Sequence, residues 1–572
     1  MNIYAKQLHM LFAVGALCTS TVTYSLRAQA SPSAFSKAAL AASSSDPLLD
    51  AMRQELDRER TLLVLPGLER PYFIEYRLDD LESYDAVASY GALAREEHNH
   101  QRVVRVTVRV GDYTSDSSSN KGEGSIELAP EDNDPVALQY ALWTTTDEAY
   151  KTALQGYARK QATLKRFEKQ ATERDFSPAK ALVHLEPLVP LKLDEAAWKQ
   201  RIVDASGAFR TDPKLRVCEP HVQYSSANVH GIAMNRWLVN SEGTVLRQGS
   251  SGYSANMSVG GQANDGMRLS RDNGTTSPRA DELESAQAFH QRAVANVESL
   301  EALRNAPLAE AEDFHGPVLF SGDAAADVLH HLFVPNVLAE RPETGTTART
   351  TGAYQSSYRA RVLPEMLSAM DDPRVSIFAG KRLVGAYAVD DEGVPAEAVP
   401  VVERGKLMNY LTSRTPICDF PISNGHGRAA PAQSAHAQAG VMIFKANQPL
   451  TPDEMQRRLV AMAKEQGRDV YAVETLGGAM LPRLLYRVHA DGSRQLVRGA
   501  VFDELDTRSL RSEIVAAGDD PYVQNTLGTI PVTIVAPSLL FGDIGLKRAT
   551  EEQQKLPYYA PPTTMSATGS IQ

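Results

Sequence analysis

The sequence Trp237-Leu238-Val239-Asn240-Ser241-Glu242-Gly243-Thr244 decides the fold. It begins with three apolar residues, and the Asn-Ser-Glu-Gly that follows has the composition of a tight turn. A further β-like run, residues 244–247, starts directly at the end of this turn. The stretch therefore predicts two antiparallel strands joined by a hairpin turn.

Short β-like runs surround this hairpin and are separated by glycine, asparagine and serine. They are residues 215–217, 221–224, 231–239, 244–247 and 253–259. Two earlier runs, 72–78 and 104–110, alternate apolar residues with mostly polar ones, which is the period of a strand. In the second run, Arg105 and Arg109 share one face, so that face is either wet or paired with acids. Together these runs predict an antiparallel sheet.

Helical periodicity recurs between the strand-like runs. Residues 46–60, 135–175 and 277–304 carry apolar residues at helical spacing, and Asp194 opens another helix that ends before Gly207. Segment 135–175 is predicted to form one long amphipathic helix or two. A dimer-forming coiled coil is the alternative, although the apolar stripe does not keep a strict heptad.

Length and composition predict more than one globular domain. The chain has 572 residues, of which 43% are apolar and 23% charged. Its formal charge of -11 argues against a nucleic-acid partner. The composition along the chain predicts a flexible lead-in at 31–46, an N-terminal domain at 47–312, a C-terminal domain at 313–548 and a disordered tail at 549–572.

The first thirty residues have the pattern of a secretory signal peptide. Lys6 precedes the apolar stretch 8–17, and Ala28-Gln29-Ala30 fits a cleavage site with small residues. We therefore expect residues 1–30 to be removed and the protein to be exported, to the periplasm or beyond. An uncleaved N-terminal anchor is the alternative. No later segment is long and apolar enough to span a bilayer, so no membrane span is expected in the mature chain.

The cysteines restrict the disulfide and metal chemistry that is available. Three cysteines are too few for a disulfide framework or a four-cysteine zinc site. Cys218 and Cys418 remain after signal-peptide removal, and whether they pair is left open. Cys418 is interpreted as a buried structural thiol rather than a nucleophile.

Five further segments follow the hairpin in a fixed order. They are 316–320, ahead of a helix; Asp371-Asp372-Pro373; 385–395, which contains Asp390-Asp391-Glu392-Gly393; 403–407, ahead of 424–428; and 524–540. With the hairpin, they resemble the TldD/PmbA family, also called the modulators of DNA gyrase, over roughly residues 220–545. The resemblance implies an α+β fold, with an N-terminal mixed α/β domain followed by a β-rich C-terminal domain. It also implies a relationship to metallopeptidases and to their metal-free partner subunits.

The peptidase-type members of this family carry His-Glu-x-x-x-His on a helix, and a cysteine near the C-terminus completes their zinc site. The corresponding helix here is expected at 323–334. His330 falls on the first ligand, His331 replaces the glutamate base and Pro335 replaces the second histidine. Residues 522–530, the region of the thiolate ligand, contain no cysteine. The resemblance therefore implies a remnant of the motif without catalytic residues or metal, because a lone imidazole does not hold zinc.

A relocated metal site is the alternative, built from histidines and acids that the fold would have to bring together. The candidates are His315, His331, His426, His436, Asp390, Asp391 and Glu392. For the three acids, the simpler interpretation is an acidic turn. The sequence has no serine-nucleophile elbow, no phosphate-binding loop and no dinucleotide-binding fingerprint.

The resemblance implies an exported, non-catalytic subunit that binds a peptide or an unfolded protein segment and shapes the chamber of a peptidase assembly. Its partner would be a metal-bearing TldD-like subunit in a hetero-oligomer, or a second copy in a homo-oligomer. No cofactor is expected, and zinc only if the site is relocated. The alternatives are an active metallopeptidase with such a site, and a homodimeric peptide-binding protein without chemistry.

Overall fold

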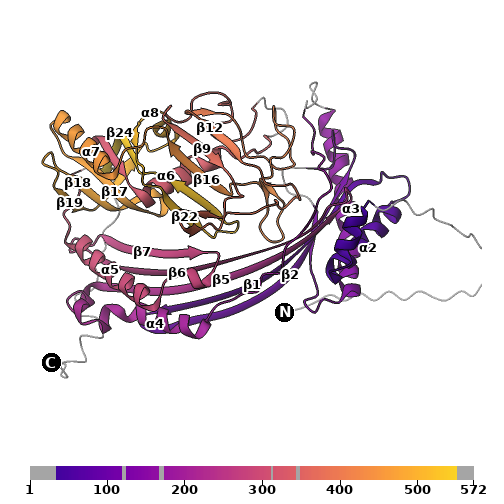
Figure 1. The fold of residues 1–572 in the computed structure, drawn as a ribbon, viewed down its shortest axis with the longest axis horizontal. Helices are drawn as coiled ribbons and strands as arrows, with labels where there is room; N and C mark the ends of the chain where they lie inside the picture. The colour runs from indigo at the N-terminus through magenta and orange to yellow at the C-terminus, as the bar shows by residue number, and fades with distance from the viewer. Residues whose placement is uncertain (1–33, 119–123, 166–172, 311–313, 343–347, 550–572) are drawn as a thin grey trace, which may run out of the picture. The chain divides into compact units, whose positions relative to one another are not determined.

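The computed structural model describes residues 34–549, apart from 119–123, 166–172, 311–313 and 343–347. The predicted signal peptide, all of the tail except Ala549, and the division between residues 312 and 313 lie outside the described residues. The α+β fold class is confirmed: a mixed helix and strand region comes first and a β-rich region follows (Figure 1). Among the described residues, no helix is both long and apolar enough to cross a membrane.

Four long antiparallel strands form the main sheet of the N-terminal part. They are β1 (Pro71–Ser89), β2 (Ala92–Val110), β5 (Val222–Asn240) and β6 (Val245–Gln262). The strand order is β3-β2-β1-β5-β6-β4, and β7 (Arg268–Ser277) pairs with the remainder of β6. The short strands are β3 (Ser125–Leu128) and β4 (Val183–Leu185). The predicted hairpin is confirmed, with β5 and β6 on either side of the turn at 241–244.

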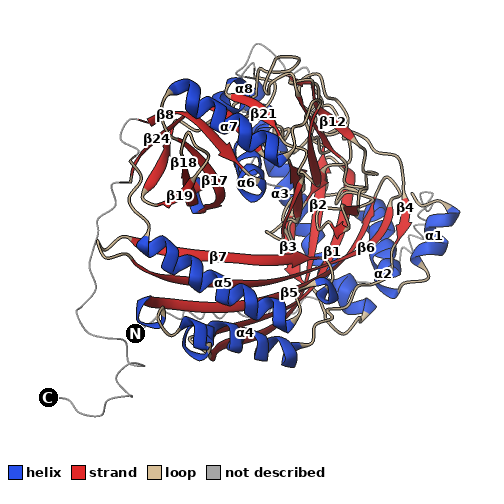
Figure 2. Ribbon diagram, turned by 60° about the vertical axis from the view of Figure 1, so that its left-hand side comes forward, coloured by secondary structure: helices blue, strands red, loops and turns tan. Residues whose placement is uncertain are grey.

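The main sheet carries two separate apolar cores along the same strands. At one end, α2 (Pro47–Leu62) and α3 (Pro135–Leu164) pack on side chains such as Tyr76 and Trp237. At the other end, α4 (Glu195–Thr211) and α5 (Ala286–Asn305) cover one face of β5, β6 and β7 (Figure 2). Strands β1, β5 and β6 contribute residues to both cores.

The predicted flexible lead-in at 31–46 is wrong for its described residues. Ser36 caps α1 (Lys37–Ser43) by accepting a hydrogen bond from the backbone of Ala39. Phe35 and Ala39 are buried in the first core, which stabilises the short helix. Asp46 then caps α2 and also accepts a hydrogen bond from the indole N–H of Trp237 at 2.9 Å.

Several predicted boundaries in the N-terminal part are also wrong. Helix α4 continues through Gly207 instead of ending before it. The glycine is needed there for packing rather than for a helix end, because a Cβ at position 207 would lie 3.0 Å from the Cα atom of Gly91. Residues 215–217, predicted as a strand, lie at the end of the 3-10 turn Pro213–Leu215 and in the turn that follows it. Helix α3 ends at Leu164 rather than near 175, and α5 begins at Ala286 rather than near 277.

The C-terminal part contains two larger sheets, ordered β13-β12-β9-β16-β23-β22 and β19-β18-β17-β8-β24-β20, with β21 paired to β24. Their strands are β8 (Phe314–Phe320), β9 (Leu367–Asp371), β12 (Val399–Glu403), β13 (Lys406–Leu407), β16 (Val441–Ala446), β17 (Val470–Gly477), β18 (Leu481–Val488), β19 (Arg494–Val497), β20 (Ala500–Asp503), β21 (Ile514–Ala517), β22 (Tyr522–Thr526), β23 (Val532–Ala536) and β24 (Leu539–Arg548). Helix α6 (Gly322–Leu332) packs in the core that both sheets share. Helix α7 (Pro452–Gln466) packs on β8 and β17.

Candidate functional site

Helix α6 carries the residues that the sequence identifies as the remnant of a zinc motif. Its buried side, which includes Val328 and Leu329, packs into the core of the C-terminal part. Asp323, Asp327 and His331 recur every four residues and so share another face of the helix. Burial and repulsion from Asp327 raise the pKa of Asp323 to about 6.

The two histidines of α6 are adjacent in sequence but differ in burial and in hydrogen bonding. Burial, followed by the proximity of His331, lowers the pKa of His330, so the imidazole is neutral at pH 7. The ring centroids of His330 and His331 are 5.4 Å apart. His331 uses Nδ1 to donate to the carbonyl oxygen of Asp327 at 2.9 Å. That nitrogen is therefore engaged by the helix itself.

Pro335 lies beyond the end of the helix. Helix α6 ends at Leu332, and Pro335 belongs to the 3-10 turn Val334–Asn336. The prediction that the helix extends to residue 334 is therefore wrong by two residues. Phe333 is the C-terminal cap of the helix, so Pro335 lies outside it. Pro335 has no backbone N–H to continue the helix and no side-chain atom that could bind a metal ion. The position of the second histidine ligand is thus occupied by a residue that cannot bind metal through its side chain.

Strand β22, from the region where the family has its thiolate ligand, lies against α6. Its Gln524 donates from Nε2 to Oδ1 of Asp327 at 2.6 Å. The residues where α6 meets β22 are therefore one neutral imidazole, the carboxylate of Asp327, whose Oδ1 already accepts from Gln524, and the amide itself. That makes two candidate zinc ligands, whereas zinc needs three or four imidazole, thiolate or carboxylate ligands. They do not fit zinc. In the part of the chain that the structure describes, no three His, Cys, Asp or Glu side chains are placed to hold a metal ion.

The other candidate histidines lie in different elements. His315, on β8, is exposed and its Nδ1 is 3.9 Å from Asp543. His426 is fully buried, with Nε2 3.2 Å from Asp371 and Nδ1 3.0 Å from the carbonyl oxygen of Asn424. His436 is exposed on β15 (His436–Ala437). The structure does not gather them around His331.

Asp391 lies in a buried ion-pair cluster that joins the main sheet to the C-terminal part. We call this cluster the charged seam; its members are Asp79, Arg236, Asp391 and Arg428. Arg236 on β5 is 2.6 Å from both Asp79 and Asp391, and Arg428 is 3.0 Å from Asp391. Burial raises the pKa of Asp391, but Arg236 and Arg428 outweigh burial and hold it well below its usual range. The seam fastens β5 to the 390–393 turn.

Asp390 and Glu392 flank this residue in the same turn and are also buried. Asp390 accepts hydrogen bonds from the backbone N–H groups of Glu392, Val394 and Gly427 at 2.8–3.0 Å. Burial nevertheless raises its pKa to about 7. Burial and the neighbouring Asp390 raise the pKa of Glu392 to about 8. The bonding pattern is that of a structural acidic turn.

The two described cysteines are not paired. Cys218 and Cys418 are free thiols, each partly buried. Burial raises the pKa of both thiols, which opposes formation of the reactive thiolate. Neither is placed as a nucleophile.

Strand β7 presents a free edge that the sequence pattern does not indicate, because its sequence RLSRDNGTTS is mostly polar. The backbone carbonyl oxygen of Thr276 accepts a hydrogen bond from Asn525 on β22, so it points away from β6. Along a strand, the backbone N–H and C=O groups of every second residue point to the same side, so those of the other even-numbered residues of β7 also point away from β6. The backbone groups of Ser270, Asp272 and Gly274 therefore face outward, and among the described residues no backbone hydrogen bond reaches them.

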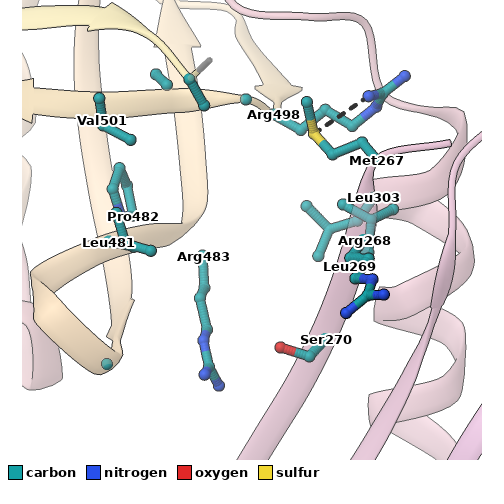
Figure 3. A pocket seen from close by; sticks show the side chains of 14 residues that line it. Met267, Arg268, Leu269, Ser270, Leu303, Leu481, Pro482, Arg483, Arg498 and Val501 are labelled. Carbon is teal, nitrogen blue, oxygen red and sulfur yellow. Dashed lines mark hydrogen bonds between the residues drawn. The ribbon is translucent and has the colours of Figure 1, made fainter. Parts of the chain in front are cut away.

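A pocket of about 220 Å³ opens beside the first residues of this edge (Figure 3). On one side it is lined by Leu269 and Ser270 of β7 and by Leu303 of α5. Pro482 and Arg483 of β18 line the other side. An extended chain on the β7 edge would thus run next to a pocket for one of its groups.

The comparisons with known proteins relate the chain to one family. Residues 315–548 match the family model described as the PmbA/TldA metallopeptidase C-terminal domain. This match confirms the resemblance to the TldD/PmbA family. No curated protein matches the chain in sequence.

Three solved structures share the fold. TldE from Thermococcus kodakarensis is 12% identical with a TM-score of 0.59, covering 87% of this chain and 99% of that one. A protein described as a modulator of a DNA gyrase from Thermotoga maritima is 14% identical, with a TM-score of 0.57 and coverage of 83% and 96%. The corresponding protein from Bacteroides thetaiotaomicron is 11% identical, with a TM-score of 0.56 and coverage of 88% and 98%.

Proposed function

The chain is a TldD/PmbA-family homologue, and from this premise we propose that it is an exported, non-catalytic subunit that binds extended peptides within a peptidase assembly. The observation that carries the proposal is the composition of the α6 site. His330 and His331 occupy the positions of the first ligand and the base, and Pro335 lies off the helix. Gln524 lies where β22 meets this helix. These residues cannot activate a water molecule in the way that a zinc peptidase does.

The free edge of β7 supports the peptide-binding half of the proposal. Outward-facing backbone groups at Ser270, Asp272 and Gly274 can pair with an added strand, which binds main chain irrespective of sequence. The edge is accessible, because Asp272 and Gly274 are exposed. The length of β7 and the contact of Thr276 with β22 restrict this pairing to a short stretch. Catalysis would then belong to a metal-bearing TldD-like partner.

The first expected result concerns zinc and cleavage. The purified chain should contain far less than one zinc per molecule and should leave an unfolded protein such as reduced casein intact. His330→Ala should change neither result, because the imidazole lacks the further ligands of a zinc site. Elemental analysis and gel assays with and without a chelator measure both. Chelator-sensitive cleavage that His330→Ala abolishes would favour the relocated metallopeptidase instead.

The second expected result concerns strand addition. Ser270→Pro removes an outward N–H without touching the β6 ladder, so it should weaken binding of a labelled Val/Thr peptide by roughly fivefold to tenfold, the effect of about one hydrogen bond. Fluorescence anisotropy measures the affinity. Ser270→Ala keeps the N–H and is the matched control, expected to bind like the parent chain. Equal affinities for the proline and alanine variants would argue that the peptide lies elsewhere.

A further inference from the structure

Arginines are concentrated around the pocket beside β7. Arg268, Arg483 and Arg498 line it, and Figure 3 shows Arg483 extending from the β18 side toward the level of Ser270. Arg498 is paired with Asp265 at 2.9 Å, and Arg483 contacts Asp272. Arg268 is exposed, and no carboxylate of the described residues lies within ion-pair distance of it.

A fourth arginine, Arg271, follows the lining residue Ser270 on β7. Arg271 is 6% exposed, and its only described hydrogen bond is from Nη1 to the hydroxyl of Thr475 at 3.1 Å. Its Nε is buried without a partner. In the described part of the chain, the four guanidinium groups thus have two carboxylates, Asp265 and Asp272, within ion-pair distance. This excess of positive charge favours an anionic ligand.

Apart from Ser270, the remaining lining side chains are apolar. They include Leu269, Leu303, Leu481, Pro482 and Val501. A ligand that matches both features carries a carboxylate next to an apolar group. Guanidinium groups bind carboxylates with charge-assisted, often bidentate hydrogen bonds, and apolar lining accepts a hydrocarbon side chain.

We propose that this pocket binds the C-terminal carboxylate and the apolar last side chain of an extended peptide that lies on the free edge of β7. The geometry sets the direction. The pocket adjoins Arg268–Ser270, at the start of β7, so a peptide antiparallel to β7 brings its C-terminus to the pocket. An N-terminal ammonium group would meet the arginines with like charge. This inference rests on the proposed peptide binding and adds the class of ligand.

The test compares two labelled peptides of identical sequence that end in leucine, one a free acid and the other an amide. The full-length mature chain should bind the free acid at least tenfold more tightly. Arg268→Gln and Arg483→Gln should each reduce this preference severalfold, because each removes a guanidinium group that binds the free carboxylate more strongly than the neutral amide. Arg268 is exposed, so its variant is expected to fold even if Arg483→Gln does not. Arg494→Gln is the matched control. It removes an arginine that is paired with Glu474 in the same sheet as Arg483, so it should keep the preference for the free acid.

The outcomes separate this inference from the proposed function. Equal binding of acid and amide, with Ser270→Pro still weakening both, would overturn carboxylate recognition and leave strand addition standing. Failure of both peptides to bind would overturn the proposed function itself. An amide peptide ending in aspartate that binds as tightly as the free acid would overturn recognition of the chain end.

Discussion

Asp391→Asn is expected to destabilise the protein strongly, because it breaks the centre of the charged seam. The substitution keeps the shape of the side chain but removes the negative charge between Arg236 and Arg428. Both guanidinium groups are buried or nearly so, and removing one partner of a buried ion pair costs about 3–5 kcal/mol. Differential scanning fluorimetry should show an apparent melting temperature about 3–5 °C lower, since the unfolding entropy of a chain of this length is about 1 kcal/mol per kelvin.

The matched control is Asp543→Asn, which removes an exposed carboxylate that is 3.9 Å from His315. Surface pairs of this kind contribute about 0–1 kcal/mol, so this variant should melt close to the parent chain. A result in which both variants melt alike would show that the charged seam does not stabilise the contact between the main sheet and the C-terminal part.

Raising the pH from about 5.5 to 8.5 is expected to destabilise the protein through Glu392. Burial and Asp390 raise the folded-state pKa of Glu392 to about 8, whereas an unfolded glutamate titrates at about 4.3. Between these values the folded state binds more protons than the unfolded state. The stabilising contribution is therefore complete below the unfolded pKa and is lost as the pH rises through the folded pKa. One bound proton corresponds to about 1.4 kcal/mol for each pH unit.

Glu392→Gln should reduce the slope of this dependence, because the amide stays neutral over the whole range, while Asp390, whose pKa burial raises to about 7, still titrates within it. Melting temperatures of the parent and the variant, taken at half-unit intervals of pH, give the two slopes. Glu465→Gln, on the exposed side of α7, should keep the slope of the parent chain. Parallel curves for the parent and Glu392→Gln would mean that Glu392 is already ionised at neutral pH.

The sequence predicts the sheet but not the length of its strands. Residues 221–224 and 231–239 read as separate runs, because Asn228 and His230 interrupt the apolar pattern. In the structure both belong to β5, and they face away from α4 and α5 on a partly exposed face of the sheet. A strand that is polar on one face looks like a broken strand when only apolar runs are counted.

The site residues divide in a similar way. The positions of His330, His331 and Pro335 could be read from order along the chain, since the helix follows β8 directly. The ion pairs of Asp391 could not, because Arg236 lies about 155 positions earlier and reaches it only when β5 packs on the turn. The β7 edge could not be predicted either, because an unpaired edge is defined by what lies beside it and not by composition.

Because β5 contributes residues to both apolar cores, insertions and deletions within this strand are expected not to be tolerated. Val229 belongs to the core beneath α4 and α5, and Trp237 to the core beneath α2 and α3, with Arg236 of the charged seam beside it. Inserting a single codon between positions 229 and 236 would invert the faces of one half of the strand relative to the other. Homologues are therefore expected to gain or lose residues at turns such as Tyr90-Gly91, while these strands keep a constant length.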